Sequence, residues 1–172
     1  AVAANKTDPW TGVFWSNVTS QSRGPAPLAR GWFGFVAAQS APIFYVFGGR
    51  GDSGCLNDLY QLDASSSRPT WSKFAQDGGP SKRFGASVVL SDDSILFVFG
   101  GQDDAGVVLG DLFFFDLSNR QWSSGCNSIH SSFYSISPWP RFYPASAAVQ
   151  DGDVFLFGGV NDHGILGDLY HL

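Results

Sequence analysis

The 172-residue sequence contains no Met and no Glu, so all 15 of its acidic residues are Asp. Strong helix formers are therefore scarce, whereas Gly (21 residues) and Phe (16 residues) are abundant, which favours an all-β fold. The 10 Lys and Arg residues are scattered singly and the net charge is −5, which argues against a general nucleic-acid or anionic-membrane surface. No apolar stretch approaches the ~18 residues that span a bilayer, so we expect no membrane insertion.

Three segments of the sequence follow one pattern: an Arg, a hydrophobic stretch, a pair of glycines, a loop, and Asp-Leu followed by an aromatic residue. The Arg residues are Arg30, Arg83 and Arg141, the glycine pairs are 48–49, 100–101 and 158–159, and the triplets begin at Asp58, Asp111 and Asp168. The repeats start 53 and 58 residues apart, which is typical of the blades of a propeller.

The second repeat shows how such a unit forms a small antiparallel sheet. Residues 84–90 and 95–99 are rich in apolar strand formers, and residues 91–94 between them have the composition of a turn. We expect the following glycine pair to end the second strand, because glycine adopts backbone angles closed to other residues. A third strand is expected at 112–115 and a fourth around Trp122.

This pattern, with Trp71 and Trp122 closing the first two copies, resembles kelch repeats, which form four-stranded blades of a β-propeller. The resemblance covers residues from about 15 to 172 and implies an all-β, kelch-type β-propeller segment with an incomplete ring. It also implies that the glycines, the aromatic residues and the Trp are framework positions, so none is a catalytic candidate. We expect a single kelch-repeat region over 1–172, divided into an N-terminal segment (1–29), blades at 30–82 and 83–140, and three strands of a further blade at 141–172.

Three repeats are fewer than the ~4 to 8 blades that usually close a propeller. Trp15 stands where the outer strand of a preceding blade belongs, and the sequence ends after the third strand of its last unit. Two arrangements follow. Either the chain is part of a longer propeller, or two copies assemble head to tail, with the Trp15 strand of one copy paired near Tyr170 of the other. Trp71 and Trp122 are expected to be buried.

The sequence also predicts which end of the blades binds partners. In an up-and-down blade the loop between the second and third strands and the connection to the next blade emerge at the same end, and here both are elaborate. Because binding residues concentrate on loops held by a rigid scaffold, we expect a protein partner at this end. The candidate residues are Arg50, Asp52, Gln102, Asp103, Asp104, Asn161, Asp162, His163, Tyr134 and Trp139.

Short motifs for adhesion, metal binding and catalysis were also considered. The Arg-Gly-Asp tripeptide at 50–52 arises easily in a polar glycine-rich loop, so an adhesion function is not favoured. The sequence shows no ordered calcium-ligand pattern, no His pair at metal-ligand spacing and no nucleophile with a base, so no metal, cofactor or catalytic residue is predicted. Some kelch-type propellers are copper oxidases, but their His and Tyr ligand set cannot be assembled here.

Two pairs of residues bear on the compartment. Asn5 and Asn17 each begin an Asn-X-Thr acceptor pattern, which is glycosylated only in the secretory route. Cys55 and Cys126 form either a disulfide in an oxidising compartment or two separate thiols in a reducing one, and we favour the disulfide. These signs predict an extracellular or secretory location, with the cytoplasm as the alternative.

The leading hypothesis is a non-catalytic, kelch-type scaffold for protein interaction or assembly, extracellular and glycosylated. One alternative is the propeller portion of an enzyme whose catalytic residues lie outside this chain. Another is a carbohydrate-binding propeller, with Trp32, Tyr134 and Trp139 as stacking surfaces.

Overall fold

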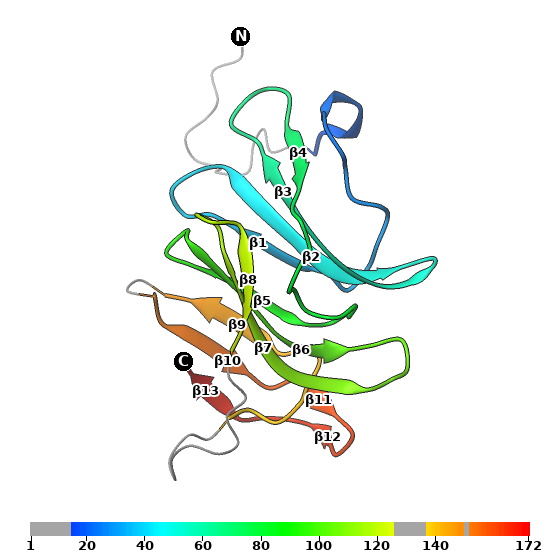
Figure 1. The fold of residues 1–172 in the computed structure, drawn as a ribbon, viewed down its shortest axis with the longest axis vertical. Helices are drawn as coiled ribbons and strands as arrows, with labels where there is room; N and C mark the ends of the chain where they lie inside the picture. The colour runs from blue at the N-terminus through cyan, green and yellow to red at the C-terminus, as the bar shows by residue number, and fades with distance from the viewer. Residues whose placement is uncertain (1–14, 126–136, 150–151) are drawn as a thin grey trace, which may run out of the picture.

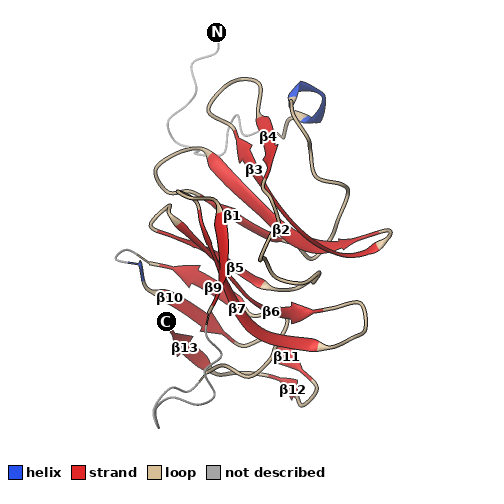
Figure 2. Ribbon diagram, viewed as in Figure 1, coloured by secondary structure: helices blue, strands red, loops and turns tan. Residues whose placement is uncertain are grey.

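The computed structural model describes residues 15–125, 137–149 and 152–172. No α-helix is present among them, and the chain is built from strands joined by turns (Figure 2). The elements are η1 (Thr19–Gln21), β1 (Gly34–Ala37), β2 (Ile43–Gly51), β3 (Gly54–Asp63), β4 (Thr70–Lys73), β5 (Ser87–Ser91), β6 (Ile95–Gln102), β7 (Val108–Asp116), β8 (Gln121–Ser124), β9 (Ala145–Ala148), β10 (Val154–Phe157), β11 (Val160–Asn161), β12 (Gly164–Ile165) and β13 (Leu169–His171).

These strands form three antiparallel units in chain order. β1 to β4 make one four-stranded sheet and β5 to β8 make a second, each with its strands side by side in sequence order. The third unit has the order β9, β10, β13, and the short ladder β11–β12 continues from it beyond the glycine pair. The all-β prediction is confirmed, and each repeat of the sequence corresponds to one unit.

The glycine pairs do not end the second strands of the first two sheets, so that prediction is wrong. β2 and β6 both continue through their glycines, and the pairing register shifts there, between Phe47 and Gly49 and between Phe99 and Gly101. The physical reason is that both glycines of each pair have positive φ, which inserts a bulge and bends the strand without breaking the ladder. In the third unit the pair does separate β10 from β11.

The sheets are stacked face to face in chain order (Figure 1), with β1 against β5 and β5 against β9. The core between the first two sheets contains Tyr45, Phe47 and Leu59 from one side and Leu96, Val98, Phe115 and Trp122 from the other. The ring of Trp122 lies 5.6 Å from that of Phe47. The predicted burial of Trp122 is confirmed, at 9% exposure.

The predicted burial of Trp71 is wrong. Trp71 is half-buried, because it lies on the face of the first sheet that no other sheet of the described residues covers, whereas its counterpart Trp122 is covered. Trp15 is fully exposed and lies in no strand among the described residues; its predicted role in the outer strand of a preceding blade, paired near Tyr170 of another copy, stays a prediction. Arg23 pairs in parallel with Thr70 of β4, where the Arg23 carbonyl accepts from the Trp71 N–H at 2.8 Å.

No helix among the residues described here has the length and apolar character needed to cross a membrane.

Candidate protein-binding face

Each repeat holds its Arg in an almost identical site. The guanidinium of Arg83 is fully buried; it donates to the Gly100 carbonyl at 3.0 Å and, through two nitrogens, to both carboxylate oxygens of Asp111. Arg30 repeats this arrangement with the Gly48 carbonyl and Asp58, and Arg141 repeats it with the Gly158 carbonyl and Asp168. The Arg, the glycine pair and the Asp of the sequence pattern therefore form one structural unit.

The electrostatics of the third copy illustrate the strength of this pairing. Hydrogen bonds from Arg141, together with its charge, hold the pKa of Asp168 down at about 2, against the opposing effect of burial. Both partners are thus ionised at neutral pH. Each Arg thus ties its glycine pair to its Asp within one sheet, which is a role in the framework of the fold.

The backbone of each Arg joins its own sheet to the preceding one. The Gly49 N–H donates to the Arg83 carbonyl, and the Arg83 N–H donates to the Leu56 carbonyl, each at 2.9 Å. Two residues further on, the Gly85 N–H donates to the Trp32 carbonyl at 2.9 Å. We call these three hydrogen bonds the Arg connector.

The same connector recurs between the second and third sheets. Gly101 donates to the Arg141 carbonyl at 2.8 Å, and Arg141 donates to the Leu109 carbonyl at 3.1 Å. Tyr143 donates to the Gly85 carbonyl at 2.7 Å. The residue two positions after each Arg has positive φ, which is 54° at Trp32, 64° at Gly85 and 56° at Tyr143.

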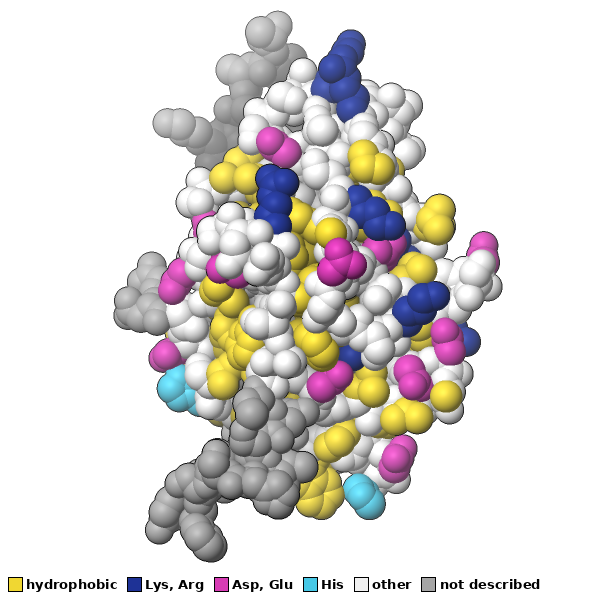
Figure 3. Space-filling model, viewed as in Figure 1, with side chains coloured by type: hydrophobic (Ala, Val, Ile, Leu, Met, Phe, Trp, Pro, Cys, Tyr) yellow, Lys and Arg dark blue, Asp and Glu magenta, His cyan; other side chains and the backbone are white. Residues whose placement is uncertain are grey.

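The hairpins that carry most of the predicted partner-binding residues lie on one side of the molecule. In Figure 1 the β2–β3, β6–β7 and β11–β12 turns all lie toward the right. The connections between sheets arrive at this end as well, since Phe84 bridges Gln102 and Phe142 bridges Val160. Loops and connections therefore share one end, as the strand count predicts. Over the face drawn in Figure 3, acidic and basic side chains are interspersed, so no single sign of charge dominates it.

A cluster of aromatic residues lies where the connections enter the sheets. The Phe84 ring is buried and lies 5.7 Å from Trp32, 6.1 Å from Tyr143 and 6.3 Å from Phe142. Trp32 and Tyr143 are 60% and 44% exposed. Positive φ is unfavourable for such bulky residues, and strain of this kind is common at binding sites. We call Trp32, Phe84, Phe142 and Tyr143, with Arg50, the aromatic rim.

Arg50 connects the rim to the hairpin loops. Its guanidinium lies 5.7 Å from the centre of the Phe84 ring and 3.7 Å from the carboxylate of Asp104. Both oxygens of Asp104 accept from the Cys55 N–H, at 3.0 and 2.9 Å, and these bonds lower the pKa of Asp104. Almost half of the Arg50 side chain remains exposed, so its charge is available to a partner.

The other predicted partner-binding residues differ in their surroundings. Trp139 and His163 are brought together, with ring centres 5.6 Å apart, and the Trp is 59% exposed. Asp103 and Gln102 instead stabilise their own loop, because the Asp103 carboxylate accepts from the Val107 N–H and Gln102 donates to the Gly106 carbonyl. Asp52 and Asp162 are exposed, and Asn161 accepts from the His163 N–H. Tyr134 lies outside the described residues.

Sequence reasoning missed Phe84 and Tyr143 and considered Trp32 only as a carbohydrate contact. The available signal was positional, because Trp32, Gly85 and Tyr143 all stand two residues after a repeat Arg.

The prediction of a secretory location was based on two Asn-X-Thr patterns and two cysteines, and the structure gives it no support. The Cys55 thiol is free and buried, and burial raises its pKa to about 11; Cys126 lies outside the described residues. Asn17 is exposed and accepts from the Thr19 N–H at 2.9 Å, whereas Asn5 is not described. Within the described residues, no group of three or more His, Cys or acidic side chains could hold a metal ion.

Comparison with known proteins agrees with the geometry. The KLHDC2/KLHL20/DRC7 Kelch-repeats domain matches residues 67–172. Similar proteins include Adagio protein 3 of Arabidopsis thaliana (36% identical over 154 residues, 88% of this chain and 23% of that protein) and Adagio-like protein 3 of Oryza sativa subsp. japonica (36% over 121 residues, 70% and 18%). The Host cell factor homolog hcf-1 of Caenorhabditis elegans is 31% identical over 157 residues, 83% of this chain and 19% of its own length.

The chain thus spans less than a quarter of the length of these relatives. Its three repeats, their matching Arg sites and the family match lead to one conclusion: the chain belongs to the kelch-repeat family of β-propeller proteins.

Proposed function

We propose that this chain is a non-catalytic, kelch-type propeller segment whose aromatic rim binds a protein partner. The observation that carries the proposal is the exposure of Trp32 and Tyr143 on strained backbone around a buried Phe84. Large aromatic side chains and Arg are the residues that most often dominate protein–protein binding energy. Here the rim combines both, since Arg50 covers one side of Phe84.

The framework supports this proposal because it fixes the rim in place. Trp32 and Tyr143 contribute backbone hydrogen bonds to the Arg connectors, so their positions are set by the sheets and not by a mobile loop. A rigid aromatic surface loses little conformational entropy when it is covered. The expectation of an extracellular glycoprotein gains no support from Asn17 or Cys55 and forms no part of the proposed function.

The test compares proteins recovered with the chain and with rim variants. Trp32→Ala, Tyr143→Ala and Arg50→Ala are each expected to reduce recovery of a specific partner at least about tenfold, the range of a binding hot spot. Trp15→Ala is the matched control, because Trp15 is fully exposed and lies outside the rim. Circular dichroism should show that every variant keeps its strands.

Two results would overturn the proposal. One is a partner that binds the three rim variants as tightly as the unaltered chain. The other is an immobilised glycan that retains the chain and releases the Trp32→Ala variant, which would assign the rim to carbohydrate.

A further inference from the structure

Two exposed rings of the aromatic rim meet at the middle repeat. Trp32 comes from the first unit and Tyr143 from the third, and their ring centres lie 5.7 and 6.1 Å from that of the buried Phe84. Gly85 makes this approach possible, because a Cβ atom there would lie only 2.7 Å from the Tyr143 ring. The three rings thus form one surface whose contacts are all between consecutive units.

Both exposed rings keep a hydrogen-bond donor free. Within the described residues, the indole N–H of Trp32 and the hydroxyl of Tyr143 donate no hydrogen bond. Partial burial raises the pKa of Tyr143 above its usual 10, so this hydroxyl carries its proton at neutral pH. An aromatic ring with a free donor can cover an apolar group and bind a carbonyl oxygen at the same time.

Arg50 adds a positive charge beside these rings. Its backbone exchanges two hydrogen bonds of 2.9 Å with Gly31, the residue before Trp32. Its guanidinium lies 3.7 Å from the Asp104 carboxylate, which is beyond hydrogen-bond distance, and 44% of the side chain is exposed. The donors of this guanidinium are therefore open to a carboxylate of a partner, with which Arg forms its strongest hydrogen bonds.

These features match the chemistry of a proline-rich segment in the polyproline II conformation. Such a segment has no internal hydrogen bonds, so its backbone carbonyls can accept from Trp and Tyr donors while its proline rings pack on the aromatic faces. Trp32 and Tyr143 cannot lie further apart than their two distances to Phe84 taken together, a span comparable to the ~9 Å of one polyproline II turn. A rigid surface and a rigid ligand also lose little conformational entropy on binding.

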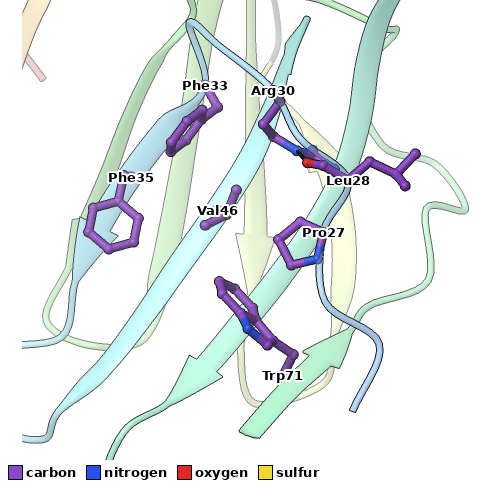
Figure 4. Close-up of a pocket in the computed structure, with 7 residues that line it drawn as sticks. All are labelled: Pro27, Leu28, Arg30, Phe33, Phe35, Val46 and Trp71. Atoms are coloured by element: carbon purple, nitrogen blue, oxygen red, sulfur yellow. Dashed lines mark hydrogen bonds between the residues drawn. The ribbon is translucent and has the colours of Figure 1, made fainter. Parts of the chain in front are cut away.

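The apolar hollow on the first sheet differs from the rim in its charge. Figure 4 shows this hollow bordered by Phe35 and Trp71, with Arg30 among the lining residues. The Arg30 guanidinium already donates to both carboxylate oxygens of Asp58, and its side chain is only 3% exposed. The hollow therefore lacks the accessible charge that Arg50 supplies at the rim.

We propose that the aromatic rim binds a proline-rich segment of its protein partner, held in the polyproline II conformation, and that an acidic residue of this segment pairs with Arg50. Proline rings cover Trp32 and Tyr143, and backbone carbonyls of the segment accept from the indole N–H and the phenol hydroxyl. This inference rests on the proposed function and narrows it to one chemistry of the bound segment.

Fluorescence polarisation with labelled peptides on the unaltered 172-residue chain is the direct test. The probe is the capped peptide Glu-Pro-Pro-Pro-Pro-Pro-Pro-Glu, which carries a carboxylate at each end so that both directions of binding are probed. One control peptide has Lys in place of each Glu, and another has alternating Gly and Ser in place of the prolines. We expect saturable binding of the probe and at least about tenfold weaker binding of each control. Equal binding of the three peptides, or no binding of the probe, would overturn the proposal.

Variants of the chain then assign the contacts. Trp32→Ala and Tyr143→Ala should each weaken binding of the probe at least about tenfold. Arg50→Ala should bind the Glu and Lys peptides equally, because it lacks the charge that distinguishes them. Leu28→Ala is the matched control and should bind the probe unchanged, because Leu28 is 72% exposed and lines the hollow of Figure 4 and not the rim.

Two results with these variants would contradict the assigned contacts. One is an Arg50→Ala chain that still prefers the Glu peptide, and the other is a ring variant that binds the probe as tightly as Leu28→Ala. Circular dichroism should show that each variant keeps its strands. The comparison of peptides uses only the unaltered chain, so it decides the proposal even if a variant fails to fold.

The outcomes also separate this inference from the proposed function. If recovery of a protein partner depends on Trp32 and Tyr143 but the probe does not bind, the rim binds a segment of another chemistry, and only the proline assignment is wrong. If the probe does not bind and recovery is also independent of the rim, both proposals fail.

Discussion

Replacing Arg83 by Met tests whether the repeated Arg is an energetic element of the fold. The side chain is fully buried, and it satisfies the Gly100 carbonyl, both oxygens of Asp111 and the Ser81 carbonyl. Met preserves much of the length and apolar volume of Arg but removes every donor. The substitution therefore leaves a carboxylate and two carbonyls without their partner.

The expected cost follows from this geometry. Breaking one side of a buried ion pair costs roughly 3–5 kcal/mol. Because the Asp111 side chain is 33% exposed and can regain water, we expect a value near the lower limit, about 3 kcal/mol. With a urea dependence of about 1–3 kcal/mol per M, the unfolding midpoint should fall by about 1–3 M.

Equilibrium urea unfolding followed by tryptophan fluorescence measures this change. Arg50→Met is the control, because its ion pair with Asp104 is 44% and 48% exposed and should contribute no more than about 1 kcal/mol. The double variant Arg83→Met with Asp111→Leu should recover most of the loss, since it leaves no carboxylate unpaired. The reasoning is refuted if Arg83→Met costs no more than the Arg50 control.

Two further predictions concern the contact between the first and second sheets. In urea unfolding, Trp122→Ala should lower the free energy of unfolding by roughly 3–5 kcal/mol. Trp71→Ala should lower it clearly less, because Trp122 but not Trp71 belongs to the core between the sheets, and equal losses would contradict this. Across this contact, hydrogen bonds from Ser40, the larger cause, and from the Gln39 N–H hold the pKa of Asp93 below its usual 3.8. The ionised Asp93 therefore stabilises the fold at pH values above 3.8, and this contribution is lost as the pH falls through the lowered pKa. In the Asp93→Asn variant the free energy of unfolding should therefore fall less steeply as the pH is lowered. If it falls as steeply as in the unaltered chain, Asp93 does not contribute to the acid sensitivity.

The strands and their order were predictable because each repeat alternates apolar runs with turn residues. For example, the turn composition of residues 91–94 and the apolar run at 95–99 predicted the hairpin that joins β5 to β6. The behaviour of the glycine pair was not predictable in the same way. Positive φ at two successive glycines is compatible with either the end of a strand or a bulge, and only the pairing partners across the sheet decide between them.

The Arg sites were visible in the sequence only as constant spacing. Nothing in Arg83 or Asp111 alone indicates that they meet, because their contact depends on how the β6–β7 hairpin folds back. Burial of Trp71 was overestimated for a related reason. The repeat pattern predicts which face of a strand is apolar, but whether another sheet covers that face is a property of the assembled stack.

One position in each repeat has a backbone role that is independent of its side chain. The residue two places after the Arg completes the connector with its backbone, while its side chain at Trp32 and Tyr143 projects from a positive-φ conformation into the rim. Backbone hydrogen bonds do not depend on side-chain identity, and Gly85 makes the same bonds with no side chain at all. The side chain at this position can therefore differ from one repeat to the next without loss of the connector, so under the proposed function one uniform framework would carry different binding side chains.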